Sequence, residues 1–564
     1  MADACYVTNS QDGITLTGYR GDGAILLAFD LDQQHTPHLA GFALQVTPPN
    51  GQPSYLLNRL NFAQPITNTT TPDQRVWTPT NQAPLQKFRW IDFPANLVSG
   101  SYTYAVTAMY FSDGGLTAGP STSIAIELVP TQPPFAGFQM GFTRGYLSSQ
   151  AYAHLFHNAP VAPTPKSIDY DTGAYLPQYQ WLGYDARKLV FDFLNEALND
   201  PAITLDVLAF DLDEPDVIRA LQQLGGRLRI FMDDSPLHTK SGAMELEAKA
   251  RFVTSAGAGN VKTGHFHRFA HCKVMIQKKN GTPVKVLTGS ANFSVRGLYV
   301  QANNILVFDD PATAQLYEQA FEQSFTAAPG FSKASIAQQW FDLPREQLPP
   351  AAVCFSPHSS PDISLSRVAS AIQQAQNSVL YAIMELQGSG PVLDDIKALG
   401  ANPKIFGYGI TQSDKGMTVY KPGAPNGVLT EFSFLNKQVP ANFQQEYSGG
   451  MGQVIHDKFV VVDFNGPHPW VFTGSSNLAA GGEEANGDNL LAINDPAVAV
   501  AYGVEAIRLV DHYDFRSVMQ SATATQPLTL QPDSANWWAP YYDPSNARST
   551  ERSLLCRGVA APAP

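Results

Sequence analysis

A motif that occurs twice, 185 positions apart, constrains the fold of this chain more than any other feature. Each copy is a His-x-Lys triplet followed by Gly-Ser-x-Asn, at 271–273 with 289–292 and at 456–458 with 474–477. The same offset relates Asn304 to Asn489 and Asp310 to Asp495. Landmarks that match without a gap indicate two copies of one folding unit, and each copy carries one His, one Lys and one Asn.

Length and composition predict a multidomain globular protein. The chain has 564 residues, of which 44% are hydrophobic, so several domains with sizeable cores are expected. We see no run of about 18 apolar residues, and hence predict no membrane span. The first ten residues lack a basic start followed by an apolar stretch, so no signal peptide is predicted. The sequence is compatible with a secreted and with a cytoplasmic location.

The net charge of −13 argues against a general nucleic-acid binder, whose footprint is usually basic. Charge is unevenly distributed, however. Residues 251–300 contain no Asp or Glu but eight Lys and Arg, and this stretch surrounds the first motif. A locally cationic site in an acidic protein suits a small anionic group such as a phosphodiester.

The four cysteines are too few and too scattered for a disulfide scaffold or a zinc knuckle, although one disulfide is possible. They are Cys5, Cys272, Cys354 and Cys556. Cys272 lies between the His and Lys of the first motif, and we interpret it as a core thiol that points away from both.

Residues 1–130 are predicted to be all-β. Short β-rich runs, such as the alternating Tyr102–Ala108, are separated by Gly, Pro, Asn and Asp clusters. Ser112-Asp113-Gly114-Gly115 supplies a hairpin turn. This segment resembles a fibronectin type III or immunoglobulin-like sandwich in architecture. It carries no catalytic cluster, so a spacer or adhesion module is the expected role.

Two α/β units follow, at 138–347 and 351–564. The first contains a helix at 185–199, a strand at 203–210, a helix at 216–224 and a strand at 228–232. The second repeats this order at 364–375, 379–384, 392–399 and 404–408. Alternating helices and strands predict helices that cover a sheet. Loop-rich insertions at 236–268 and 411–455 precede the motifs and are predicted to form substrate walls.

Each His-x-Lys stands at the start of a β run, where alternate residues share one face. A second run then delivers Gly-Ser-x-Asn, whose small residues allow close approach of a ligand and whose Asn offers an N–H donor. Two units face to face would place two His, two Lys and two Asn around one phosphorus. Lys273, Lys458, Asn292 and Asn477 would hold the non-bridging oxygens, and one His would attack while the other protonates the leaving group.

The chain thus resembles the phospholipase D superfamily, whose signature is HxKxxxxD followed by GSxN. The second copy fits in full with His456, Lys458 and Asp463, whereas the first has Lys278 in place of the Asp. The resemblance implies two α/β/α sandwich halves related by a pseudo-twofold axis, with one active site at their interface. It also implies a phosphohistidine intermediate and no metal or other cofactor. The implied catalytic residues are His271, Lys273, Asn292, His456, Lys458, Asp463 and Asn477.

In this superfamily a side chain about 13 residues past the Ser of GSxN hydrogen-bonds the His. Those positions are Asn303 and Asp488, and we assign them, with Ser290 and Ser475, to substrate binding and orientation. If each residue serves its own copy, Asp488 would favour a cationic His456 as general acid, and Asn303 would leave His271 neutral and nucleophilic. The alternative pair of orienting residues is Asn304 and Asn489.

Two further clusters have weaker interpretations. His265 and His267 precede the first motif and could join His271 in a metal site, but loop or surface histidines are the favoured interpretation. Trp537, Trp538, Tyr541 and Tyr542 could contact lipid at the mouth of the site. A tail that packs over the second half is the expected arrangement.

The sequence therefore predicts a phosphodiesterase that hydrolyses phospholipid head groups and could transfer the phosphatidyl group to an alcohol. A peripheral membrane surface is a possible partner. A nuclease or another phosphodiesterase with the same site is the first alternative, although nucleic acid normally calls for extended basic contacts. An inactive binding protein with an adhesion module is the alternative of another class.

Overall fold

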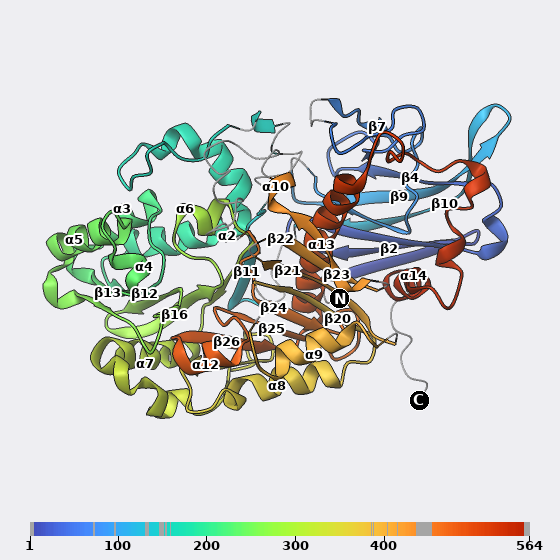
Figure 1. Cartoon of the computed structure of the whole chain (residues 1–564). Coiled ribbons are helices and arrows are strands. Elements are labelled where there is room, and N and C mark those ends of the chain that lie inside the picture. The colour runs from blue at the N-terminus through green and yellow to red at the C-terminus, as the bar shows by residue number, and fades with distance from the viewer. Residues whose placement is uncertain are drawn as a thin grey trace.

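The computed structural model of the chain describes residues 5–70, 74–94, 97–129, 135–145, 152, 155–157, 159–384, 386, 388–402, 404–413, 415–422, 424–435 and 454–557. Figure 1 shows a β-rich region at one side of the molecule and two α/β halves beside it. None of the described helices is both long enough and apolar enough to cross a bilayer. All four cysteines are free.

The N-terminal region is all-β, as predicted, and consists mainly of two four-stranded antiparallel sheets. The first has the order β1 (Tyr6–Gln11), β2 (Ile14–Arg20), β3 (Ile25–Leu31) and β8 (Arg89–Asp92). The second has the order β10 (Gly115–Glu127), β9 (Ser101–Ser112), β4 (Leu39–Thr47) and β5 (Ser54–Tyr55). Alternate residues of β9, among them Tyr102, Tyr104 and Val106, enter the apolar core that both sheets share. The likeness to a fibronectin type III or immunoglobulin-like domain stays a prediction.

The first half contains a seven-stranded mixed sheet. Its order is β11 (Phe138–Phe142), β17 (Asn304–Phe308), β16 (Thr282–Gly289), β15 (Val274–Lys279), β12 (Ile203–Ala209), β13 (Leu228–Asp233) and β14 (Val261–Gly264). One apolar cluster joins the sheet to α2 (Leu176–Asn199), α3 (Pro215–Leu224), α5 (Met244–Ala256) and α6 (Val295–Tyr299). A separate cluster joins it to α7 (Pro311–Ala327).

The second half repeats this architecture in a nine-stranded sheet. Its order is β18 (Phe341–Asp342), β19 (Ala351–Ser356), β26 (Asp488–Ile493), β25 (Trp470–Gly474), β24 (Phe459–Val462), β20 (Ser378–Ile383), β21 (Phe406–Ser413), β22 (Gly416–Lys421) and β23 (Ala424–Glu431). Its helices are α8 (Asp362–Gln373), α9 (Pro391–Leu399), α10 (Phe432–Leu435), α12 (Ala480–Ala485) and α13 (Pro496–Ser521). The strands β19-β26-β25-β24-β20-β21 correspond in order and direction to β11-β17-β16-β15-β12-β13. The prediction of two α/β/α halves is confirmed.

The predicted insertions contain more regular structure than expected. The segment 236–268 holds α4 (Pro236–Thr239), α5 and β14. The described part of 411–455 holds the hairpin β22–β23, which extends the sheet of the second half, and the short helix α10. The prediction of loop-rich segments is therefore wrong for these residues, and 436–453 lies outside the described residues.

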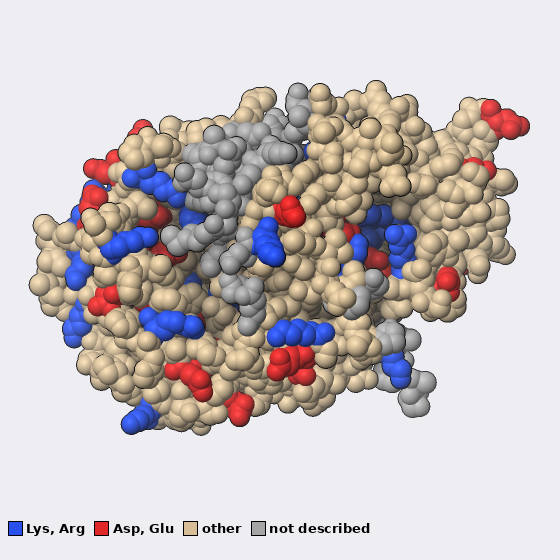
Figure 2. Space-filling view, viewed as in Figure 1, with Lys and Arg blue, Asp and Glu red and all other residues tan. Residues whose placement is uncertain are grey.

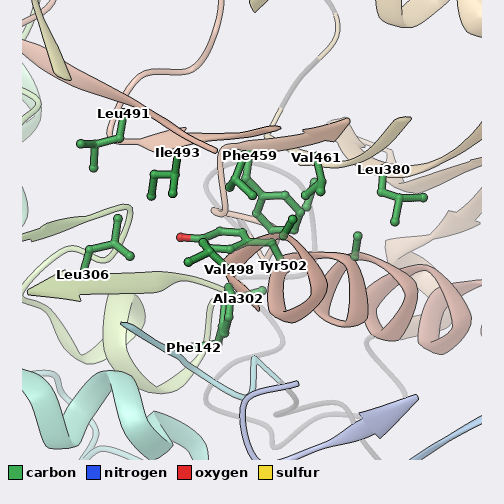
Figure 3. Packing of buried hydrophobic residues seen from close by; sticks show 14 of the residues in the cluster. Phe142, Ala302, Leu306, Leu380, Phe459, Val461, Leu491, Ile493, Val498 and Tyr502 are labelled. Atoms are coloured by element: carbon green, nitrogen blue, oxygen red, sulfur yellow. The ribbon is translucent and has the colours of Figure 1, made fainter. Parts of the chain in front are cut away.

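The two halves meet on α13, which begins 185 positions after α7. Figure 3 shows Tyr502 of α13 among apolar residues of both sheets. Its ring lies 5.1 Å from that of Phe459 in β24 and 4.8 Å from that of Phe142 in β11 of the first half. Because such interiors are closely packed, this contact fixes the position of one half against the other.

The C-terminal tail packs against the β-rich region. Trp537 and Tyr541 are buried in the core of the two antiparallel sheets, and the Trp537 indole N–H donates to the Leu39 carbonyl at 2.8 Å. The helix α14 (Ala547–Arg557) continues along this region, where the Tyr19 hydroxyl donates to the Leu555 carbonyl at 2.8 Å. The expectation that these aromatic residues cover the second half is therefore wrong, because the β-rich region has an apolar core that they complete.

Arg89 of β8 connects the β-rich region to the second half and to the C-terminal tail. Its guanidinium lies between Asp511 of α13 and Glu551 of α14, and it also donates to the Tyr408 hydroxyl at 2.7 Å. Its side chain is only 8% exposed. We expect Arg89→Met to lower the free energy of unfolding by about 3–5 kcal/mol, because two carboxylates lose their common cation.

Denaturant unfolding followed by circular dichroism would measure this change. The matched control is Lys188→Met, which breaks the exposed pair with Asp192 and should change stability by less than about 1 kcal/mol. Equal unfolding midpoints for the two variants would show that Arg89 does not hold the junction.

Candidate active site

The two copies of the motif converge on one cavity. His271 and Lys273 lie just before β15, and His456 and Lys458 lie just before β24. The rings of His271 and His456 are 6.5 Å apart between centroids. A cavity of about 740 Å³ is lined by both rings and by Asn292 and Asn477, which follow β16 and β25. Each half therefore supplies one His and one Asn to a shared wall.

The two lysines are fully buried behind the rings. The Lys458 ammonium donates to the His456 carbonyl at 2.6 Å, and the Lys273 ammonium donates to the His271 carbonyl. Burial lowers the pKa of Lys273 to about 8, although Asp488 and Asp211 oppose the shift. Burial and the charge of Lys273 lower the pKa of Lys458 well below its usual value. An anion in the cavity would favour the charged form of both lysines.

The partners of the two histidines cross from one half to the other. His271 Nδ1 lies 2.8 Å from Asp488 Oδ1, and His456 Nδ1 lies 2.9 Å from Asn303 Oδ1. The predicted pairing within each copy is therefore wrong. Asp488 begins β26 and Asn303 immediately precedes β17, and these strand ends adjoin the opposite motif across the pseudo-twofold axis. A carboxylate or amide oxygen on Nδ1 keeps the proton there, so Nε2 is the free nitrogen of each ring.

The crossed partners make the two rings unequal. Burial and the charge of Lys273 lower the pKa of His271, and Asp488 counteracts them. Burial lowers the pKa of His456 well below its usual value, as do the charges of Lys458 and Lys273. An imidazolium is thus better stabilised at His271 than at His456, the opposite of the order predicted from the sequence.

Ser290 and Ser475 lie behind the site and do not line the cavity. Both hydroxyls are fully buried. Ser290 Oγ donates to Asn303 Oδ1 at 2.9 Å, and Ser475 Oγ accepts from the Asn489 backbone N–H at 3.0 Å. The assignment of these serines to substrate binding is corrected to a positioning role, because their hydrogen-bonding capacity is used within the protein.

Asn304 and Asn489 do not orient the histidines. The Asn304 amide donates to Asp457 Oδ1 at 2.8 Å, and Asn489 Oδ1 accepts from the Thr288 hydroxyl at 3.2 Å. The alternative pairing from the sequence is thus excluded by these contacts.

Asp463 also lies outside the cavity. Its carboxylate accepts the backbone N–H groups of residues 376, 377 and 378 just before β20, at 2.7–3.2 Å. The prediction that Asp463 is catalytic is corrected, because it braces the end of β24 against the neighbouring strand. At the matching position of the first half, Lys278 pairs with Asp206 at 2.6 Å and with Glu318 at 3.1 Å.

Sequence reasoning missed a network that supports the first motif. His238 Nδ1 lies 2.8 Å from Asp233 Oδ1, and His238 Nε2 lies 2.8 Å from Asp211 Oδ1. Asp233 accepts the Ala270 backbone N–H at 2.6 Å, next to His271, and Asp211 accepts the Asn292 amide N–H at 2.6 Å. The sequence feature that could have revealed this network is an Asp near the end of each of two adjacent parallel strands. Asp211 lies just beyond β12, and Asp233 is the last residue of β13.

This network holds His238 as an imidazolium. Burial alone would lower its pKa, but hydrogen bonds to Asp211 and Asp233 raise the pKa of His238 to about 10. Asp211, His238 and Glu245 are close enough together to hold a metal ion, yet both ring nitrogens of His238 already contact carboxylates. His265 pairs with Asp234 at 2.6 Å and is half exposed, so the surface interpretation of this histidine fits its position.

A comparison with protein families identifies the same two units. The family model "Cardiolipin synthase, PLD-like domain" matches residues 194–325 and 368–509, one match in each half. The chain belongs to the phospholipase D superfamily of phosphodiesterases. No curated protein matches its sequence.

Several solved structures are similar to parts of this superfamily member. The phospholipase D family member Nuc from Salmonella typhimurium shares 22% identity, over 24% of this chain and 84% of that chain, with a TM-score of 0.20. The phosphatidylserine synthase of Haemophilus influenzae Rd KW20 shares 13% identity, over 66% and 94%, with a TM-score of 0.36. Yeast tyrosyl-DNA phosphodiesterase shares 11% identity, over 53% and 84%, with a TM-score of 0.27.

The crossed partners give a first test of the site. We expect Asp488→Asn to lower kcat/KM for a soluble aryl phosphodiester by about 10²–10⁴-fold, because the ring of His271 loses the carboxylate that fixes its tautomer and stabilises its positive charge. Asp463→Asn is the matched control, and it should lower the unfolding temperature while kcat/KM changes less than about threefold. Equal kinetic losses in both variants would contradict the placement of Asp463 outside the site.

A second test concerns His238. We expect His238→Gln to lower kcat/KM by about 10–100-fold, because Asp211 and Asp233 then hold the two motif loops without their common cation. The raised pKa of His238 also adds stability that is complete below about pH 6.5 and is lost as the pH rises through about 10. Unfolding measured from pH 6 to 10 should show this loss in the parent protein and a flatter profile in the variant. Identical pH profiles would count against the charged network.

Proposed function

We propose that this enzyme hydrolyses phospholipid head groups through a covalent phosphohistidine, and that it can transfer the phosphatidyl group to an alcohol. The observation that carries the proposal is the pair of histidine rings, 6.5 Å apart in one cavity, each held at Nδ1 by the opposite half. A phosphodiester between the rings would meet one Nε2 on each side. In-line displacement requires this arrangement, with the nucleophile and the proton donor on opposite sides of phosphorus.

His271 is the proposed nucleophile. Attack of Nε2 on phosphorus forms the P–N bond and leaves the ring positively charged, and Asp488, as acceptor of Nδ1–H, stabilises that charge. The sequence suggested the same role for His271 on a pairing that is wrong, so the role now rests on Asp488 and not on Asn303.

His456 is the proposed general acid. Its partner is an amide, so its proton leaves more readily than that of a carboxylate-bound ring. The anionic substrate beside it favours the protonated form before reaction. As the P–O bond to the leaving alcohol breaks, His456 Nε2–H protonates the alkoxide. The neutral ring then takes a proton from water, or from an acceptor alcohol, which attacks phosphorus and releases His271.

The charge around the cavity favours a single phosphodiester over a polyanion. Three carboxylates of the first half line it, Asp211, Asp213 and Glu245, together with Lys240, Arg268 and Arg296. Burial raises the pKa of Asp213 to about 6 and that of Glu245 to about 7, as expected where negative charge is already crowded. In Figure 2, acidic and basic residues are interspersed over the described part of the visible face. A nucleic acid is usually bound along a continuous basic track.

The mechanism requires both histidines. We expect His271→Ala and His456→Ala each to lower turnover of a soluble aryl phosphodiester by at least about 10³-fold, because nucleophile and acid act as one unit. Quenching a reaction with ³²P-labelled phosphatidylcholine in alkaline detergent, which preserves a P–N bond, followed by peptide mapping at alkaline pH, should place the label on the peptide that contains His271. Label on His456 would reverse the two roles, and full activity in either variant would exclude a shared site.

Substrate class is tested separately. Phosphatidylcholine, phosphatidylethanolamine and single-stranded DNA should be compared at equal concentration of phosphodiester, with release of head group or of nucleotides as the measurement. We expect hydrolysis of phospholipid to exceed hydrolysis of DNA. Cleavage of DNA alone would replace the phospholipid proposal, and inactivity towards all three and towards the aryl diester would indicate a binding protein.

A further inference from the structure

Exposed hydrophobic side chains are concentrated in one segment of the β-rich region. Five of the thirteen exposed large hydrophobic residues in the described part of the chain lie between positions 55 and 77, with 37–47% of their surface accessible. They are Tyr55, Leu57, Phe62, Val76 and Trp77, and we call them the β6–β7 surface, since the segment contains the short pair β6 (Leu57–Asn58) and β7 (Thr78–Pro79). Single exposed hydrophobic residues are ordinary, whereas several within one short segment favour an interaction site.

The charge of this segment differs from that of the whole chain. Asp73 is the single acidic residue between Pro48 and Arg89, although the chain as a whole carries a net charge of −13. Arg59 stacks on Trp77, with its guanidinium carbon 5.4 Å from the ring centroid, and on Phe515 of α13, at 5.0 Å. The remaining exposed positions are mostly Thr, Asn, Gln and Pro. Aromatic rings with arginine and few carboxylates are typical of side chains at a membrane–water interface.

The β6–β7 surface is connected to the catalytic cavity through one short helix. Ile66 exchanges two backbone hydrogen bonds with Leu528, at 2.9 and 2.8 Å, and packs in a small core with Phe434 and Met519. Phe434 belongs to α10, and Phe432 of the same helix lines the catalytic cavity. In Figure 1, β7 and α10 both lie toward the upper side of the molecule. Ile66 of this segment therefore packs against the short helix that contributes Phe432 to the cavity.

We propose that the β6–β7 surface binds the surface of a phospholipid bilayer and holds the enzyme where a lipid head group can enter the catalytic cavity. This inference rests on the proposed phospholipid substrate. Trp77, Tyr55 and Phe62 would enter the head-group region. A bilayer fits better than a folded protein partner because the proposed substrate must itself come from such a surface, and because Ile66 of the same segment packs against the helix that contributes Phe432 to the cavity.

The experiment compares vesicle binding with soluble catalysis. We expect the Phe62→Ala/Trp77→Ala double variant to bind phosphatidylcholine vesicles at least about tenfold more weakly than the parent protein in co-sedimentation, since two aromatic side chains lose their burial in lipid. Its apparent KM for vesicular phospholipid should rise in proportion. Its kcat/KM for a soluble aryl phosphodiester should stay within about twofold, because neither residue lines the cavity.

Two further variants keep the result interpretable. Leu246→Ala, which removes an equally exposed side chain on α5 of the first half, should bind vesicles as the parent does. Tyr55→Ser, at an exposed edge-strand position, should reproduce part of the loss if the double variant proves unstable.

The outcomes separate this inference from the proposed function. Equal vesicle binding by the double variant and the parent would overturn the surface assignment, whatever the activity. Concentration-dependent dimerisation that the double variant abolishes would assign the surface to a second copy of the chain and would also overturn it. A parent protein that cleaves the soluble diester and binds vesicles through this surface, but hydrolyses no phospholipid, would refute the proposed substrate and leave the membrane contact in place.

Discussion

The crossed contacts between the halves are the interaction on which the site depends. His271 is oriented by Asp488 of the second half, and His456 by Asn303 of the first. Neither half therefore contains a complete catalytic unit, and a small rotation between them would displace both Nε2 atoms at once. The closely packed contact of Tyr502 with Phe142 and Phe459 is consequently part of the catalytic architecture, although it lies in an apolar core.

Much of the fold follows from the sequence because it depends on local periodicity and on the repeat. The predicted helix at 216–224 and strand at 203–210 lie within one residue of α3 and β12. The strands within 411–435 were not predicted, because the Gly-interrupted runs of β22 and β23 have no counterpart in the first copy. The strand conformation of β22 comes from pairing with β21, and that of β23 from pairing with β22. Such pairing is a tertiary effect that a local pattern does not contain.

The His and Asn residues that line the cavity could be predicted from the sequence, but their connections could not. A constant offset identifies equivalent positions in the two copies. It does not indicate whether Asp488 contacts the histidine of its own copy or that of the other copy. The choice between the two depends on which strand ends meet at the pseudo-twofold axis. The network of Asp211, His238 and Asp233 escaped prediction for a similar reason, because its members come from strand ends and a short helix that only the folded sheet brings together.

The two differences between the copies are of different kinds. Where the second copy has Asp463 bound to backbone N–H groups, the first has Lys278 paired with Asp206 and Glu318, so one brace replaces another far from the cavity. The change from Asp488 to Asn303 has no such replacement, since each residue contacts a catalytic ring directly. A duplicated pair of histidines thus acquires distinct charge preferences from a single side chain, and the proposed division into nucleophile and proton donor rests on this asymmetry.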